Sequence, residues 1–417
     1  MCALFRQIFP LHTACLVSLS LTITACSRSS DDGGHLFRIE EIDGVPTAIT
    51  AGGPRYAEPI FNFELILTLK QDPDREESLL FRPTEFTMDR DGFFYVLDQG
   101  NGRVAVFDPG GDYVRAFGGK GKGPGEFEWM ELQSLDDDII SVFDLDQQRM
   151  TRYRTDGTLL EVLTNPTGGR NYGLRRGPDD LLLLFDSSHR TENNLAYSSY
   201  SVLVIDSRRD TVAVMETSEA IVGFSQTEEV GGGGMMVSSW SIPFTGSPGA
   251  VYVPGRGLLM TSGDEPVLFL YDLTGKLIKV ITIDLPLLPV TGSMRQDYEA
   301  RMRESMERAA ARSGRAPRAL PNFRYPEFIG YWNQILVDDS GFIWLRKVPA
   351  GIQQPEEIWP YMILDPDGRY LGDVYCPARS GNIVNGRYLA LVTDPDAGEV
   401  VPNVYSITPA VRGLRYP

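Results

Sequence analysis

The sequence predicts an all-β chain, a six-bladed β-propeller of four-stranded antiparallel blades with one inserted α-helix. Three observations predict this fold. Residues 81–127 form a complete unit of four short strands, weaker copies of the unit follow it, and the last copy lacks one strand that an N-terminal segment can supply. One four-stranded sheet cannot bury both of its faces alone, so it needs neighbouring copies of itself.

In the first unit, short runs of alternating apolar residues are separated by turns at Asp89–Gly92 and Asp108–Gly111. Alternation with a period of two, interrupted by Asp/Gly turns, is typical of a β-meander. The expected strands are Glu85–Met88, Phe93–Leu97, Arg103–Phe107 and Tyr113–Phe117.

Further units follow at intervals suited to propeller blades. In the second unit Asp144 and Arg149 take the places of Asp98 and Arg103, 46 residues later. The later units are weaker and are recognised by strand pattern alone. The expected copies are 136–163, 177–215, 250–283, 331–374 and 382–407.

The last unit, 382–407, has only three strands, and Phe63–Leu69 can supply its outer strand. Closing a ring with strands from both ends of the chain leaves no exposed sheet edge at the junction. The expected organisation is a lipoprotein signal peptide at 1–25, a tether at 26–60 and a six-bladed β-propeller at 61–410, with a helical insertion at about 293–313.

The signal peptide ends in Thr24-Ala25-Cys26, which suits lipid attachment to Cys26; the alternative is an ordinary secretory signal cleaved nearby. The expected location is the cell envelope, with a lipid anchor in the outer membrane, on its periplasmic or surface side. The formal net charge of −17 argues against nucleic acid and against wide contact with anionic lipid. Membrane contact is therefore expected through the anchor only, and the chain is expected to be a monomer.

Residues for catalysis are scarce. Only His35 and His189 remain after the signal peptide, and there is no Gly-x-Ser-x-Gly motif. Most aspartates precede a glycine closely, which is typical of turn capping, with calcium binding as the alternative. Cys376 is expected to be a structural thiol. The sequence therefore predicts no catalytic residue, no metal ligand and no cofactor, with Ca²⁺ as the alternative cofactor.

The long connections predict which face binds a ligand. In a four-stranded blade, the links between blades and the connection between the second and third strands lie on one face, which we call the long-loop face. The other face, here the short-turn face, carries mostly short Asp/Gly turns. Loops of this length are uncommon without a function. The long connections are 186–200, 216–249, 285–330 and 346–360.

The link 285–330 also holds the one expected helix. Ser293 and Gln296 suggest a capping box, and Gly314 ends the helix. Tyr298, Met302 and Met306 repeat every four residues, so this stripe is expected to face the propeller.

Two sets of residues are candidates for ligand binding. Asp98 with Arg103, and Asp144 with Arg149, line the axial mouth or brace loops between blades. The second set holds aromatic and basic residues expected on the long-loop face, with packing between blades as the alternative for the aromatic ones. It comprises Trp240, Tyr331, Trp332, Trp344, Arg346 and Lys347.

The segment 98–103 (DQGNGR) and the segment 121–127 (GKGPGEF) resemble the NHL-type six-bladed propellers found in bacterial lipoproteins, and the resemblance extends over about 60–410. It implies the fold but no single activity. Two functions are therefore expected. The first is a membrane-anchored, non-catalytic scaffold that binds a protein, peptide or glycan on its long-loop face. The alternative is a calcium-dependent hydrolase or lactonase with an axial site.

Overall fold

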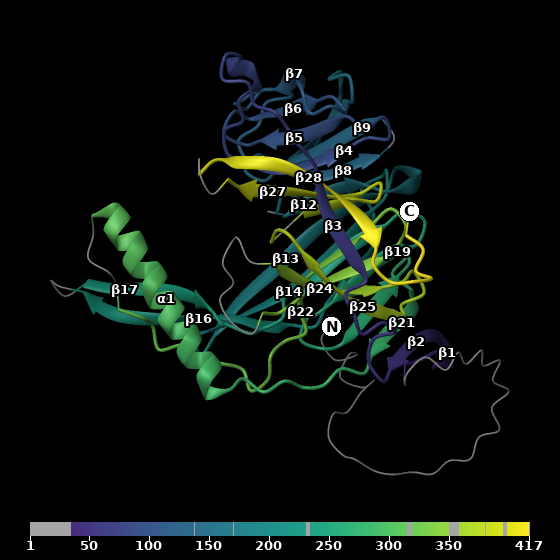
Figure 1. Cartoon of the computed structure of the whole chain (residues 1–417), viewed down its shortest axis with the longest axis vertical. Helices are drawn as coiled ribbons and strands as arrows, with labels where there is room; N and C mark the ends of the chain where they lie inside the picture. Colours follow the sequence, from purple (N-terminus) through teal and green to yellow (C-terminus); the bar gives the residue numbers. More distant parts are fainter. Residues whose placement is uncertain are drawn as a thin grey trace, which may run out of the picture. The chain divides into compact units, whose positions relative to one another are not determined.

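The computed structural model describes residues 35–416, apart from residues 137, 170, 231–233, 315–318, 350–357, 380 and 395–397. This part of the chain forms six sheets, and each contains one blade (Figure 1). The predicted signal peptide, Cys26 and the start of the predicted tether lie outside the described residues.

The first two blades are regular four-stranded meanders, as predicted. The register confirms the expected turns: Asp89 Oδ1 accepts the N–H of Phe93 at 2.9 Å, and Gly92 has a φ of 87°. A positive φ favours glycine, so the Asp/Gly pattern fixes this turn. The strands are β4 (Pro83–Met88), β5 (Phe94–Asp98), β6 (Arg103–Phe107), β7 (Tyr113–Gly118), β8 (Met130–Asp136), β9 (Ile139–Asp144), β10 (Arg149–Arg154) and β11 (Leu159–Thr164).

The third blade carries a two-stranded extension. Its strands are β12 (Gly173–Arg176), β13 (Leu182–Glu192), β14 (Leu195–Ile205) and β15 (Thr211–Glu216), followed by β16 (Ala220–Val230) and β17 (Gly234–Ser241). β14 pairs with β15 along one half and with β16 along the other. The prediction of loops at 186–200 and 216–249 is therefore wrong. Residues 186–200 continue β13 and β14 through a tight turn at Asn193–Asn194, and most of 216–249 forms the β16–β17 hairpin.

The fourth blade is enlarged at its outer edge. It contains β18 (Gly249–Val253), β19 (Gly257–Thr261), β20 (Val267–Tyr271) and β21 (Leu277–Ile283). A hairpin of β1 (Leu36–Ile42) and β2 (Val45–Ala51) joins it, with β2 parallel to β21. Residues 36–51 were expected within a tether, but they pair with β21 and extend a blade, where Ala48 and Thr50 of β2 are fully buried.

The ring closes as predicted. The fifth blade comprises β22 (Trp332–Val337), β23 (Ile343–Lys347), β24 (Trp359–Leu364) and β25 (Tyr370–Cys376). The sixth comprises β26 (Gly381–Val384), β27 (Arg387–Thr393) and β28 (Val400–Pro409), with β3 (Phe61–Thr68) as its outer strand. β3 pairs antiparallel with β28 from Phe61↔Pro409 to Thr68↔Asn403, which confirms the N-terminal closing strand.

The described hydrophobic core is divided into six clusters, and each lies between two adjacent blades. The sixth and first blades, for example, share Leu389 and Val404 with Phe86 and Phe94. Every blade therefore buries both faces against neighbours, which one sheet alone could not do. This arrangement explains why the strands are apolar on both sides.

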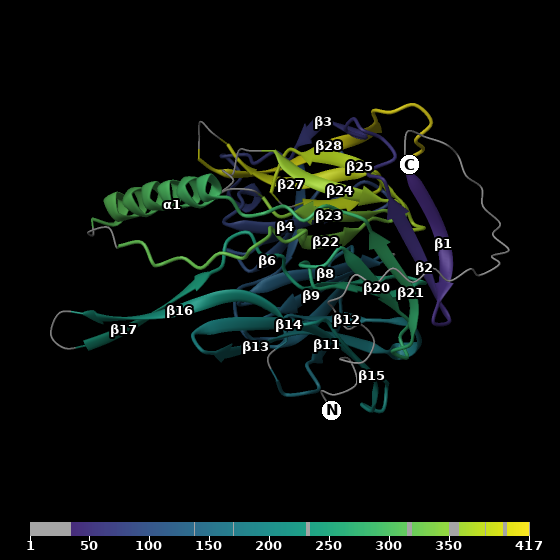
Figure 2. The same ribbon diagram turned by 90° about the horizontal axis from the view of Figure 1, so that it is seen from below.

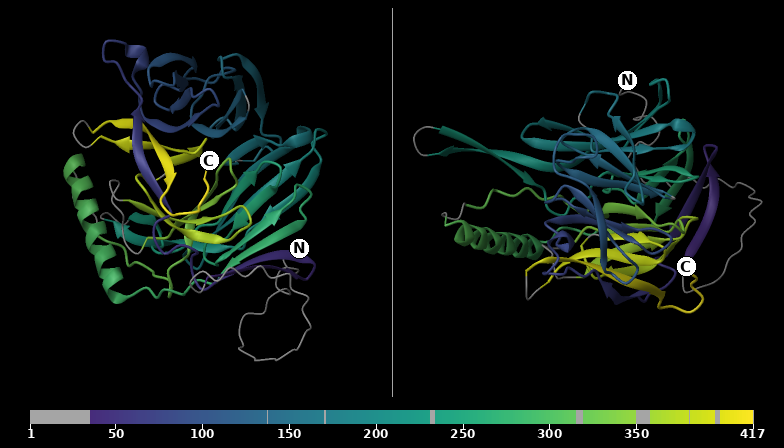
Figure 3. Two further views of the ribbon diagram at one scale, coloured as in Figure 1. Left: turned by 45° about the vertical axis from the view of Figure 1, so that its right-hand side comes forward. Right: turned by 90° about the horizontal axis from the view of Figure 1, so that it is seen from above.

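Helix α1 (Gly292–Ser313) lies in the link between the fourth and fifth blades, close to the predicted bounds. The predicted capping box is wrong, because the N-cap is Thr291, whose Oγ1 accepts the N–H of Met294 at 3.3 Å. Gly314 ends the helix in the left-handed conformation, as expected. α1 and the β16–β17 hairpin extend on the same side of the blades (Figures 2 and 3).

Candidate functional site

The first recurring pair, Asp98 and Arg103, fastens the link that enters the first blade. The Asp98 carboxylate is fully buried and accepts the N–H of Phe81 at 2.7 Å, Asn101 Nδ2 at 2.7 Å and Arg103 Nε at 2.8 Å. Arg103 also donates to the carbonyl of Leu79 at 2.8 Å. Every one of these contacts is internal, so they support the bracing interpretation.

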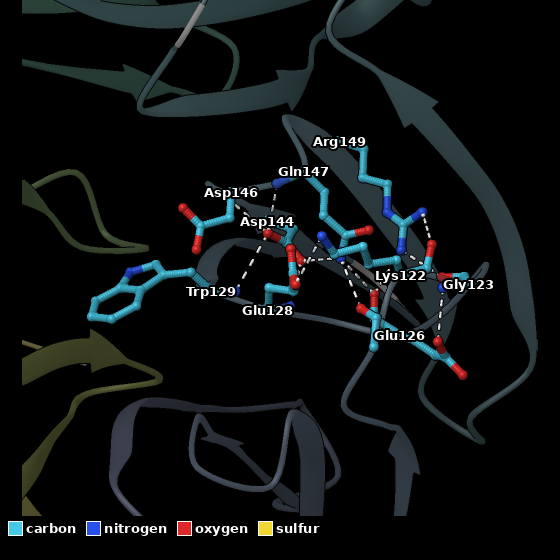
Figure 4. Close-up of polar contacts among 10 residues, drawn as sticks. Lys122, Gly123, Glu126, Glu128, Trp129, Asp144, Asp146, Gln147 and Arg149 are labelled. Carbon is cyan, nitrogen blue, oxygen red and sulfur yellow. Dashed lines mark hydrogen bonds and ion pairs between the residues drawn. The ribbon is translucent and has the colours of Figure 1, made fainter.

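The second pair, Asp144 and Arg149, fastens the link that enters the second blade through different partners (Figure 4). Buried Asp144 accepts the N–H of Glu128 at 2.7 Å and of Gln147 at 3.0 Å, and it also accepts Gln147 Nε2 at 2.6 Å. Arg149 donates to carbonyls of the preceding link, including that of Glu126 at 2.8 Å. The two arginines thus hold link carbonyls, while the two aspartates hold link N–H groups.

Two of the aromatic candidates are core residues. Trp332 is 1% exposed and donates its Nε1–H to Thr261 Oγ1 at 2.9 Å, across two blades. Trp344 is fully buried and donates to Asp338 Oδ2 at 2.9 Å. Neither ring is available to a ligand, so their expected role on the surface is corrected to packing between blades. Tyr331, partly buried, packs against Trp332 with a centroid distance of 5.8 Å.

The basic candidates Arg346 and Lys347 are half-buried and fixed by internal contacts. Arg346 donates through Nε to Asn333 Oδ1 at 2.8 Å and through a terminal nitrogen to the carbonyl of Arg379 at 2.9 Å. Burial lowers the pKa of Arg346 below its usual value. Lys347 Nζ lies 2.8 Å from Asp373 Oδ2. These residues organise the end of β23 and the link after β25.

Trp240 lies elsewhere, in a part of the long-loop face that we call the arm: β16, β17, α1 and residues 319–325. Six aromatic rings join its parts. Phe323 packs edge-on against Phe224, Trp240 and Tyr298, with centroids 6.3, 6.1 and 5.2 Å away. Tyr298, the first residue of the predicted stripe, therefore faces the cluster. The other two rings of the aromatic cluster are those of Phe244 and Tyr325.

The outer surface of the arm exposes aliphatic side chains. Met235 is 67% exposed and Val237 is 65% exposed, both on β17. Single exposed aliphatic residues are common, but here they lie on a hairpin that extends beyond the blade and ends the sheet. The arm therefore presents apolar side chains on a firmly held support.

A cavity also runs along the axis of the propeller. A cavity of about 690 Å³ is lined by the first strand of every blade. It reaches the short-turn face, because the turns Asp89–Arg90 and Asp338–Gly341 also line it. One lining residue from each blade is Glu85, Gln133, Arg175, Tyr252, Leu336 and Asn382.

Sequence reasoning missed two acids at this axis. Glu85 lines the cavity, and Glu131 lies on the neighbouring first strand; both are half-buried. Desolvation raises the pKa of Glu85 to about 7, repulsion from Glu131 adds to the rise, and the N–H of Leu132 opposes it. Desolvation also raises the pKa of Glu131 to about 7. Glu131 follows Glu85 by the same 46 residues as Asp144 follows Asp98, a signal that could have revealed the pair.

Arg175, whose charge is opposite to that of a glutamate carboxylate, lines the same cavity as Glu85. Its terminal nitrogen lies 3.3 Å from Asp136 Oδ1, and its guanidinium lies 5.0 Å from the centroid of the Tyr252 ring. Its Nε is buried without a hydrogen-bond partner. The cavity thus offers carboxyl groups and a guanidinium to a polar ligand.

Cys376 and His189 do not line the axial cavity. Cys376 is fully buried, and burial raises the pKa of its thiol well above the usual value, which disfavours the nucleophilic thiolate. His189 lies near the end of β13, where Ser187 Oγ is 2.9 Å from its Nε2. Within the residues that the structure describes, no three His, Cys, Asp or Glu side chains are grouped to hold a metal ion. None of the described helices is long and apolar enough to span a bilayer.

A match to a family model agrees with the fold. Residues 76–225 match the model of the DUF5128 family, described as a 6-bladed beta-propeller. No curated protein matches the chain.

Solved structures are similar over most of the chain, at low identity. A protein from Bacteroides fragilis named as an exported protein has 13% identity and a TM-score of 0.48, over 84% of this chain and 96% of that one. A DUF4221 family member from Bacteroides vulgatus has 10% identity and a TM-score of 0.44, over 84% and 99%. Regucalcin, a calcium-binding protein from Agrobacterium tumefaciens, has 13% identity and a TM-score of 0.37, over 86% and 100%. The six interlocked sheets and the family match together show that the chain is a six-bladed β-propeller.

Proposed function

We propose that this protein is an NHL-type, membrane-anchored and non-catalytic propeller that binds a protein, peptide or glycan through its long-loop face. The observation that carries the proposal is the arm. A hairpin and a 22-residue helix extend from this face and are joined by an aromatic cluster. Such an extension adds little to the blade cores, and its exposed Met235 and Val237 suit an interface.

Photo-crosslinking in intact cells tests this proposal. A photoreactive residue at Val237 should give a discrete adduct with the partner. Val214 is the matched control, because it is a 62% exposed valine on an outer strand of the same blade. Equal adduct patterns at both positions, or none at Val237, would count against binding through the arm.

The anchor is a separate part of the proposal and rests on the sequence around Cys26. A lipid on Cys26 is the only strong membrane-binding element that we propose. Cys26→Ser should therefore move the protein from the membrane fraction to the soluble fraction. Continued membrane association of the variant after a high-salt wash would contradict lipidation.

A second candidate is a hydrolase or lactonase with an axial site. The observation that favours it is the Glu85–Glu131 pair, since carboxyl groups with a pKa of about 7 suit general acid–base catalysis. Two carboxylates are an incomplete set for Ca²⁺, which takes about six to eight oxygen ligands. Lactone hydrolysis that needs calcium and is lost in Glu85→Gln would favour this enzyme over the binder.

A further inference from the structure

Among the residues that the structure describes, the second half of β16 has a strand beside it on one side only. β14 pairs with β16 no further than Phe224, whereas β17 continues to Val230. Main-chain groups alternate in direction along an antiparallel strand. Val222 accepts a bond from Ile242 after β17, while the N–H of Ser225 points the other way and donates to Asn194 at 2.9 Å. The next residue with this outward direction is Thr227.

A preformed groove of about 450 Å³ lies at this edge. Its lining is Asn194, 224–227 and 322–324. Gln226 ties the overhanging segment in place: its Nε2 donates to the carbonyl of Asn322 at 3.1 Å, and its Oε1 accepts the N–H of Asn322 at 3.4 Å. The packing of Phe323 against Phe224, two residues before Gln226 and on the same face of β16, also fixes this segment. The groove therefore needs no rearrangement to exist.

We propose that this groove binds an extended segment of a partner protein as an added β-strand along the edge of β16. This inference rests on the proposed function and assigns the partner chemistry for the same face. An unpaired strand edge is a template for another strand, and main-chain hydrogen bonds then supply affinity. β17 pairs with the opposite edge of β16, so this part of β16 is kept in strand geometry.

The lining also selects the side chains of the segment. Asn194, Thr227 and Asn322 are neutral and can both donate and accept hydrogen bonds. Arg324 is the one charged residue among the lining residues. An acidic side chain opposite Arg324 fits this arrangement, and it would fix the direction and register of the added strand.

A matched pair of substitutions at Thr227 tests the proposal. Thr227→Pro removes the outward N–H, and proline is tolerated where the N–H of an edge strand faces away from the sheet. The bonds to β17 come from the alternate residues and are retained. Thr227→Val keeps the N–H and the branched shape but removes the hydroxyl, so it is the control. Circular dichroism and thermal melting should confirm that both variants fold.

The probe is a displayed library of random peptides, selected on the full chain and followed by calorimetric titration of the recovered synthetic peptides. Thr227→Pro should weaken binding at least about tenfold, as expected for the loss of one main-chain hydrogen bond and the added bulk of the ring. Thr227→Val should bind like the parent. N-methylation of the peptide should weaken binding at every second residue only.

Three results would overturn the proposal. The first is that no recovered peptide distinguishes the two variants. The second is that N-methylation has no alternating effect. The third is a change from dimer to monomer caused by Thr227→Pro, which would make a second copy of this chain the occupant. If the Val237 crosslink persists while any of these is seen, binding through the arm stands and strand addition fails.

Discussion

Replacing Asp98 with alanine tests whether the links between blades depend on their buried carboxylates. The substitution leaves the N–H of Phe81, the amide of Asn101 and the guanidinium of Arg103 without their acceptor. Arg103 is only 18% exposed, so water replaces the carboxylate poorly. Breaking a buried ion pair by removing one partner costs about 3–5 kcal/mol. We expect the free energy of unfolding to fall by about that amount.

The measurement is urea unfolding followed by tryptophan fluorescence, with Asp112→Ala as the control. Asp112 also pairs with a cation, Lys70, at 2.9 Å, but both side chains are 62% exposed. Exposed pairs contribute about 0–1 kcal/mol, so the control should be nearly silent. If the two variants differ by less than about 1 kcal/mol, the buried carboxylate does not fasten the link, and the bracing argument fails.

Three further predictions follow from the fold and the axis. Deleting 61–68 should lower the melting temperature more than deleting 36–51, because only the first deletion opens the ring; equal losses would contradict the closure. The pKa of a glutamate in the unfolded chain is about 4.3. The pKa values of about 7 for Glu85 and Glu131 mean that, between these two pH values, the folded protein binds more protons than the unfolded chain. Stability should therefore fall as pH rises from about 4 to about 7, and Glu85→Gln with Glu131→Gln should flatten this slope in urea unfolding; an unchanged slope would refute the assignment. The thiol of Cys376 should react with a maleimide only as fast as the protein unfolds, and rapid labelling of the native state would show that it is accessible.

The regular blades could be predicted because local signals agree with the fold. The first two units combine alternating strands with Asp/Gly turns, and the structure has both. The closing strand could be found because 382–407 lacked a partner and an alternating segment stood before the first unit. In these cases, strand pattern and pairing requirement point to the same residues.

The additions to the blades could not be predicted, because their partners lie far away in sequence or their strands are polar. Asp43–Gly44 is a hairpin turn signal with φ of 51° and 78°, yet parallel pairing of β2 with β21 has no local signature. The extensions of β13 and β14 are mostly polar, so they resemble a loop. The Asn193–Asn194 turn, with φ of 51° and 62°, was their one local sign.

The candidate site was predicted only in part, for a reason of geometry. A tryptophan at the end of a strand can face solvent or the adjacent blade, and sequence does not distinguish these cases for Trp332 and Trp344. The recurrence of Asp98 as Asp144 is visible in the sequence. Recurrence alone, however, does not distinguish a carboxylate that braces a loop from one that lines the axial opening. The axial acids were accessible to the same argument, since Glu85 and Glu131 repeat at the same interval.

The β1–β2 hairpin changes what a lipid at Cys26 would mean for the protein. With this hairpin in the fourth blade, only residues 27–34 separate Cys26 from His35, whose Nδ1 lies 2.9 Å from the carbonyl of Gly53. Fully extended, these residues span about 30 Å, whereas a tether running to residue 60 would span on the order of 100 Å. A lipid at Cys26 would therefore hold the propeller within about 30 Å of the bilayer surface.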